Sequence, residues 1–172
     1  MKKVLVFSLL TSLLLISAGV FAQQDKSKRP SPPAKVSETT SNGLTITIDY
    51  SQPSVKGRTI GKDIAPLGKV WRTGANEATI FEIDKDAKVE GKPLKAGKYS
   101  LYSIPGQDEI TIIFNKSWNQ WGTVYKEVED ALRVKVKPSK SPAFTEQLTF
   151  TIDKSGKVLF MWGDWQVGFM VE

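Results

Sequence analysis

The chain has 172 residues and a formal net charge of +6, and it contains no histidine and no cysteine. The absence of both residue types excludes Ser-His-Asp and Cys-His catalysis, disulfide bonds, and metal sites built from imidazole or thiolate ligands. Residues 1–22 carry two of the positive charges and residues 23–35 a net three, so residues 36–172 sum to only +1 and lack the positive field that nucleic-acid binding requires.

Residues 1–22 have the pattern of a secretory signal peptide. Two lysines precede an apolar run, Val4 to Ile16, that is too short to span a bilayer comfortably. Small residues then precede a predicted cleavage site after Ala22. We therefore expect a periplasmic or secreted protein that does not span the membrane after cleavage, with an uncleaved anchor as the alternative.

Residues 23–35 are rich in Pro, Ser and Lys, which predicts a disordered linker. Residues 36–172 predict one all-β domain, an antiparallel β-sandwich or jelly roll of about nine strands, with a closed barrel as the main alternative. A turn or two of helix is expected within Thr123–Leu132. The predicted strands are Val36–Thr40, Leu44–Tyr50, Thr79–Asp84, Lys98–Ile104, Glu109–Asn115, Leu132–Lys137, Gln147–Asp153, Lys157–Trp162 and Trp165–Val171.

Four of the five tryptophans fall into two groups. Trp162 and Trp165 flank a predicted hairpin at Gly163-Asp164, so both are expected in the core or stapling the hairpin. Trp118 and Trp121 lie in a polar loop, where they could stack on a sugar or fold back as a plug over one edge of the sandwich.

Polar residues with ligand-binding chemistry gather in two turn-like stretches between residues 50 and 79. Arginine offers a planar fork for carboxylates and hydroxyl groups, and amides and carboxylates can orient the same ligand. We expect a negatively charged or polyhydroxyl ligand, and no metal or other cofactor. The candidate ligand-binding residues are Lys56, Arg58, Arg72, Asn76, Glu77, Trp118 and Trp121.

The same residues allow a structural interpretation. Arg72 and Glu77, with Asp49, could form an ion-pair network over the end of the core rather than line a pocket. Gly74 is expected to supply a positive φ in the turn between them. The catalytic alternative is a carbohydrate hydrolase that uses Glu77 and Asp49 as paired carboxylates.

Several strings resemble one bacterial family. They are PSVKGR, VWRTGANEAT, AGKYSLYSIPG and DALRVKVKP, and the resemblance, to the secreted family known as domain of unknown function 2911, runs from Pro30 to the end of the chain. It implies an exported, mostly β domain and assigns no role to the motif residues. Those residues are Lys56, Gly57, Arg58, Trp71, Arg72, Gly74, Asn76 and Glu77.

The expected function is therefore non-catalytic. We predict that the domain binds a small polar, anionic or glycan ligand, or a partner in the cell envelope. A carbohydrate hydrolase and a structural envelope interaction module are the alternatives.

Overall fold

The computed structural model describes residues 25–172, so the predicted signal peptide and its cleavage site lie outside the described residues. The described chain is all-β, as predicted, with two single turns of 3-10 helix, η1 (Lys26–Lys28) and η2 (Glu127–Glu129). η2 is all that forms of the helix expected within Thr123–Leu132. The strands are β1 (Pro33–Thr39), β2 (Thr45–Ser51), β3 (Thr79–Ile83), β4 (Ala87–Val89), β5 (Lys92–Leu94), β6 (Gly97–Pro105), β7 (Ile110–Asn115), β8 (Asp130–Val136), β9 (Ser139–Ile152) and β10 (Lys157–Met170).

Six of these strands form one antiparallel sheet in the order β1-β2-β3-β6-β7-β8. The side-chain alternation of a strand explains which face is buried: Ile46, Ile48 and Tyr50 of β2 point into the core, while the residues between them are less buried. β3 repeats this pattern with Phe81 and Ile83. The sequence predicted these strands because their apolar residues recur with a period of two.

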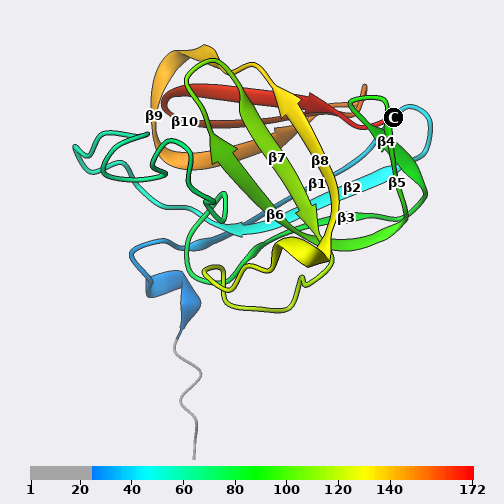
Figure 1. Ribbon diagram of the computed structural model, residues 1–172, viewed down its shortest axis with the longest axis horizontal. Coiled ribbons are helices and arrows are strands. Elements are labelled where there is room, and N and C mark those ends of the chain that lie inside the picture. The colour runs from blue at the N-terminus through cyan, green and yellow to red at the C-terminus, as the bar shows by residue number, and fades with distance from the viewer. Residues whose placement is uncertain (1–24) are drawn as a thin grey trace, which may run out of the picture.

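The long β9–β10 hairpin forms the second layer, and Figure 1 shows it lying across the six-stranded sheet. Aromatic contacts join the layers: Phe169 of β10 meets Phe81 and Phe114 of the sheet at ring-centroid distances of 6.2 and 5.8 Å. β9 also contacts β1, and β10 contacts β8, so the hairpin reaches both edges of the sheet. Each fully buried large apolar side chain contributes about 1.5–3 kcal/mol to folding, and the core has no disulfide to assist it.

The predicted hairpin at Gly163-Asp164 is wrong, because β10 runs through both residues as one strand. The register with β9 shifts on either side of Gly163, which has a φ of 57°, so the strand carries a bulge there. Trp162 is buried in the core and stacks on Trp71 at 5.0 Å. Bulges and tight turns use the same residue chemistry, which explains the error.

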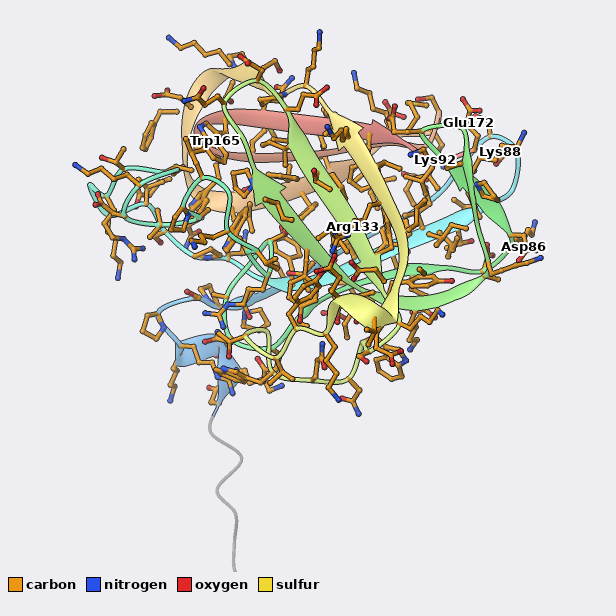
Figure 2. The ribbon with its side chains drawn as sticks, in the orientation of Figure 1. Asp86, Lys88, Lys92, Arg133, Trp165 and Glu172 are labelled. Atoms are coloured by element: carbon orange, nitrogen blue, oxygen red, sulfur yellow. The ribbon has the colours of Figure 1, made fainter. Side chains whose placement is uncertain are left out.

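A second hairpin, β4–β5, was not predicted. Its strands have three residues each, too few for a visible alternation, and Glu90 and Gly91 turn between them with positive φ. The backbones of Lys88 and Glu172 exchange two hydrogen bonds, of 2.6 and 2.8 Å, and Figure 2 labels both residues. The hairpin therefore closes the sandwich beside the end of β10.

The disorder predicted for residues 23–35 does not hold for residues 25–35. The Asp25 side chain accepts a hydrogen bond from the backbone of Ser27 at the start of η1, and β1 begins at Pro33, within the predicted linker. Arg29 is half-buried and bonded to a residue far along the chain. Composition indicated disorder because it cannot register such a distant contact. Within residues 25–172 no helix is long and apolar enough to cross a membrane.

Candidate functional site

A hollow of about 500 Å³, here called the tryptophan cleft, opens between the N-terminal segment, strands β2 and β3, and the loop that precedes η2. Figure 1 shows η1 and this loop at the same end of the molecule. The cleft collects both tryptophans and both carboxylates that the sequence singled out, together with two cations from the N-terminal segment. Its polar and aromatic lining includes Lys26, Arg29, Asp49, Glu77, Trp118 and Trp121.

Backbone pairing holds the two tryptophans at the cleft. Glu77 and Trp121 form an antiparallel bridge, flanked by bonds from Ala78 N to Gln120 O and from Gly122 N to Asn76 O, both 3.1 Å. Trp121 is 49% exposed and Trp118 is 37% exposed, which is unusual for such large apolar side chains. The loop therefore presents the rings outward instead of burying them as a plug.

The ammonium group of Lys98 covers part of Trp118. Its Nζ lies 5.1 Å from the centre of the Trp118 ring, within the range of a cation–π interaction, and 3.6 Å from a carboxylate oxygen of Glu82. One face of Trp118 is thus occupied. Trp121 is the more accessible platform of the two.

Glu77 is held in its ionised form. Arg29 Nη1 donates to both carboxylate oxygens, at 3.0 and 2.9 Å, and Lys26 Nζ lies 3.1 Å away. Burial alone would raise the pKa of Glu77, but its own backbone N–H and the side chains of Lys26 and Arg29 together lower it to about 2. The ion pair expected between Glu77 and Arg72 is therefore wrong, because the N-terminal segment provides the partners.

Asp49 lies on β2, with Lys35 of β1 opposite it in the register. Its carboxylate is exposed and lies 3.6 Å from Lys35 Nζ. Asp49 thus shares the tryptophan cleft with Glu77 while each carboxylate keeps its own basic partner. The predicted network that joined Asp49 to Arg72 does not form among the described residues.

Asn76 acts as a structural tie. Its Nδ2 donates to Ser31 O at 3.1 Å and to Ser51 Oγ at 3.3 Å, which joins the N-terminal segment to the end of β2. Asn76 also has a positive φ of 59°, a conformation that asparagine tolerates well. Its amide therefore serves the turn and is not offered to the cleft.

The turn before Asn76 also differs from expectation. The positive φ predicted for Gly74 is wrong, and Thr73 has one instead, 44°. Gly74 is needed because a Cβ there would lie 2.5 Å from Thr79 Oγ1. Close packing, not backbone handedness, requires glycine at this position.

Arg72 lines a separate, smaller hollow of about 260 Å³, here called the arginine pocket. Its Nη1 donates to the backbone oxygen of Asn76 at 3.3 Å. The hollow is lined by Val70, Trp71, Arg72, Tyr102, Gly122, Thr123 and Tyr125. Arg72 and Glu77 thus lie near each other in sequence but serve different cavities.

Arg58 and Lys56 lie in neither cavity. Arg58 folds back on its own turn, with Nε donating to Val55 O at 3.0 Å and Nη2 to Ser54 O at 2.6 Å. Lys56 donates its backbone N–H to Glu146 Oε1 at 2.8 Å and leaves its side chain exposed. The polar residues expected to share one pocket are therefore distributed over separate places.

A hollow of about 630 Å³, larger than the tryptophan cleft, lies elsewhere, and several of its lining residues are apolar, including Ile60, Leu67 and Trp165. Figure 2 labels Trp165, one of the residues that line this hollow. This hollow contains neither a predicted site residue nor a carboxylate pair. Its size therefore does not outweigh the chemistry of the tryptophan cleft.

Residues 31–171 match the model of a family described as a protein of unknown function, DUF2911. The chain belongs to the DUF2911 family. The match includes all ten strands, Asp49, Glu77 and both exposed tryptophans, whereas Lys26 and Arg29 precede it. No curated protein and no solved structure matches the chain significantly. DUF2911 membership confirms the resemblance. It assigns no role to any residue, so the roles must be argued from the geometry of the structure.

The sequence did not single out three residues that line the two hollows, Lys26 and Arg29 of the cleft and Tyr102 of the arginine pocket. Lys26 and Arg29 were assigned to a linker, and no local pattern pairs them with Glu77. Tyr102 could have been found, because β6 is buried on both faces. Tyr102 points to the face opposite Tyr99 and Leu101, so another segment must also shield that face from water. The loop before η2 does so, since Tyr102 Oη donates to Val124 O at 2.8 Å.

Proposed function

We propose that this DUF2911 protein binds a polyhydroxylated ligand, a glycan, in the tryptophan cleft without transforming it. One observation carries the proposal. The cleft places two exposed tryptophan rings beside two carboxylates, Asp49 and Glu77, in a single hollow of about 500 Å³.

The residue chemistry suits a sugar. Tryptophan provides a large flat apolar surface on which the C–H face of a pyranose can lie, and weak C–H contacts to the ring add to the buried area. Carboxylates accept hydrogen bonds from hydroxyl groups, and Asn119 and Gln120 in the same lining add amide donors and acceptors. Ligand cavities typically hold about 300–1,000 Å³, which includes this one.

The ionisation of Glu77 argues against a role as the proton donor of a glycosidase. A glycosidase needs one carboxyl group that stays protonated until it donates to the leaving oxygen, which requires a raised pKa. The pKa of Glu77 is lowered to about 2, so it carries a charge at neutral pH and accepts hydrogen bonds. Lys26 and Arg29 also occupy its oxygens, which supports a fixed acceptor instead of a proton donor.

The proposed setting is the periplasm or the exterior of the cell, reached through the predicted signal peptide. The apolar run and the small residues before Ala22 support this. Polysaccharides and other envelope glycans are abundant there, in keeping with the chemistry of the cleft.

The test is calorimetric titration of the mature protein with soluble oligosaccharides that include neutral, N-acetylated and uronic-acid chains. We expect saturable binding of at least one class, weakened about tenfold or more by Trp121→Ala, because the stacking surface is lost. Phe144→Ala is the matched control, since Phe144 is an aromatic residue with 58% exposure outside the cleft. Binding that survives in Trp121→Ala, or a panel with no binding to the wild-type protein, would contradict the proposal.

A further inference from the structure

Arg72 has no carboxylate partner. All 18 Asp and Glu residues lie from Asp25 onward, within the part that the structure describes, and none of their ion pairs involves Arg72. Its hydrogen bond to Asn76 O, at 3.3 Å, is longer than the usual range for N–H···O. A guanidinium group has five N–H donors, so most of the hydrogen-bonding capacity of Arg72 is unused by the residues of this part of the chain.

This unpaired charge is partly removed from water. Arg72 is half-buried, and burial lowers its pKa, although a nearby tyrosine, Tyr102, opposes the shift. Partial burial of a charge is costly unless hydrogen bonds or an opposite charge compensate it. The arginine pocket is the space beside Arg72 in which such compensation can be provided.

The pocket is built to hold Arg72 in place. The backbone N–H of Trp71 donates to Ser103 O and that of Ser103 to Trp71 O, both at 2.8 Å, which fixes the chain on β6. Gly122 lets the stem of Arg72 pass: a Cβ there would overlap Arg72 Cδ and lie 2.9 Å from Asn76 O. Backbone contacts thus fix the start of the Arg72 side chain and the path of its stem past Gly122.

Both tyrosine hydroxyls of the pocket already have partners. Tyr102 Oη donates to Val124 O and accepts from Gln120 Nε2 at 3.0 Å. Tyr125 Oη donates to Asp130 Oδ2 and accepts from Arg133 Nη2, both at 2.7 Å. Arg72 is therefore the charged group in this lining with donors to spare, next to the exposed Thr123.

We propose that the arginine pocket binds a small organic carboxylate with a flat or apolar body. The carboxylate takes the planar fork of Arg72, and Thr123 at the rim is within the same lining. The rings of Trp71, Tyr102 and Tyr125 receive the body of the ligand. One guanidinium balances the single negative charge of a carboxylate, whereas a phosphate dianion would keep one charge unbalanced at Arg72.

This site is independent of the glycan proposal. Arg72, Thr123 and Tyr125 line the arginine pocket and not the tryptophan cleft, while Trp121 and Glu77 line only the cleft. A carboxylate site remains even if no oligosaccharide binds. Trp121→Ala is therefore expected to leave carboxylate binding unchanged.

The test is a nitrogen-15 NMR titration of the mature protein with sodium benzoate, sodium acetate and inorganic phosphate at constant ionic strength. We expect benzoate to shift the Arg72 Nε–H, Trp71 indole and Gly122 amide signals saturably, acetate to bind more weakly, and phosphate to bind most weakly. Arg58→Gln, which removes the same charge in a distant turn, should leave the benzoate affinity unchanged, whereas Arg72→Gln should lower it about tenfold or more.

Thr123→Phe tests the site with Arg72 intact, because the exposed Thr123 position tolerates a ring that fills the pocket. Loss of benzoate binding in this folded variant supports the proposal even if Arg72→Gln does not fold. Three results would overturn it: no saturable shift at Arg72, unchanged benzoate affinity in folded Arg72→Gln or in Thr123→Phe, or tighter binding of phosphate than of benzoate.

Discussion

Arg29 Nη1 donates to both carboxylate oxygens of Glu77 although 48 residues separate them in the chain. This pair fastens the segment before β1 to the rim of the tryptophan cleft. Lys26 adds a second cation at 3.1 Å. The N-terminal segment is thus part of the wall of the cleft and not a spacer leading to it.

Arg29→Ala should loosen this segment. The Arg29 side chain is 22% exposed and that of Glu77 41%, so solvent screens the pair and the expected loss of unfolding free energy is about 0.5–1 kcal/mol. Amide exchange of the non-proline residues between 27 and 31 should accelerate more visibly than the global stability falls. Lys28→Ala is the control, since Lys28 is exposed and lies 4.0 Å from Asp25. Equal exchange rates in both variants would show that the pair does not hold the segment.

Acid should weaken the fold in part through Glu77. The pKa of Glu77 falls from 4.5 to about 2 on folding, so its stabilisation is complete above the unfolded value. It is lost as the pH falls from about 4.5 toward 2. Urea unfolding across this range should show a shallower acid dependence in Glu77→Gln than in the wild-type protein.

The control for this pH series is Glu129→Gln. Glu129 forms no ion pair among the described residues, and other carboxylates with lowered pKa values, such as Asp84 and Asp86, are present in both variants. The difference between the stability–pH curves of Glu77→Gln and Glu129→Gln therefore isolates the contribution of Glu77. Parallel curves for Glu77→Gln and the wild-type protein would mean that folding does not shift this pKa.

Gly122→Ala should be costly. The added Cβ would meet Arg72 Cδ and lie 2.9 and 3.1 Å from the backbone oxygens of Asn76 and Glu77, which cannot move independently. We expect a loss of roughly 1–3 kcal/mol in denaturant unfolding. Gly168→Ala is matched to it, because its Cβ would meet the flexible Leu159 side chain at 2.5 Å. A loss no larger than that of Gly168→Ala would refute the close approach at Gly122.

Trp162→Ala should remove a major part of the core. Trp162 is 2% exposed, stacks on Trp71 at an interplanar angle of 10°, and lies in a strand that continues past it. Large-to-small substitution at such a site costs about 3–5 kcal/mol. Phe144→Ala, at an exposed position, should cost far less. A mild effect of Trp162→Ala on the unfolding midpoint would fit an exposed hairpin better than a buried strand.

The strands with regular alternation were predictable, and the irregular ones were not. The buried face of β2 was predictable from Ile46, Ile48 and Tyr50, because burial of one face of a strand places apolar residues at every second position. Gly163 misled the prediction because glycine accommodates both a bulge and a turn. Pairing with β9 decides between a bulge and a turn at Gly163, and the residues around Gly163 do not reveal that pairing.

Only some residues of the candidate site were predictable from the sequence, and their grouping was not. Trp118 and Trp121 stood out as aromatic rings in a polar loop, and the structure places them in one cleft with Asp49 and Glu77. The assignment of Glu77 to Arg72 used sequence proximity, whereas the fold brings Arg29 to Glu77. Ion pairs form between residues that are close in space. In a strand-rich fold, residues that are close in space are often far apart in the sequence.

The pKa shifts of the carboxylates and tyrosines leave this histidine-free protein with little change of charge near neutral pH. The shifted carboxylates, such as Glu38, Asp84 and Asp153, move downward, and the shifted tyrosines, such as Tyr50 and Tyr102, move upward. Both shifts place the pKa values of these side chains further from neutral pH. If the affinity for a ligand changes between about pH 6 and 8, the change would therefore report the protonation of the ligand or of the chain's own amino terminus. The side chains of the protein would contribute little to it.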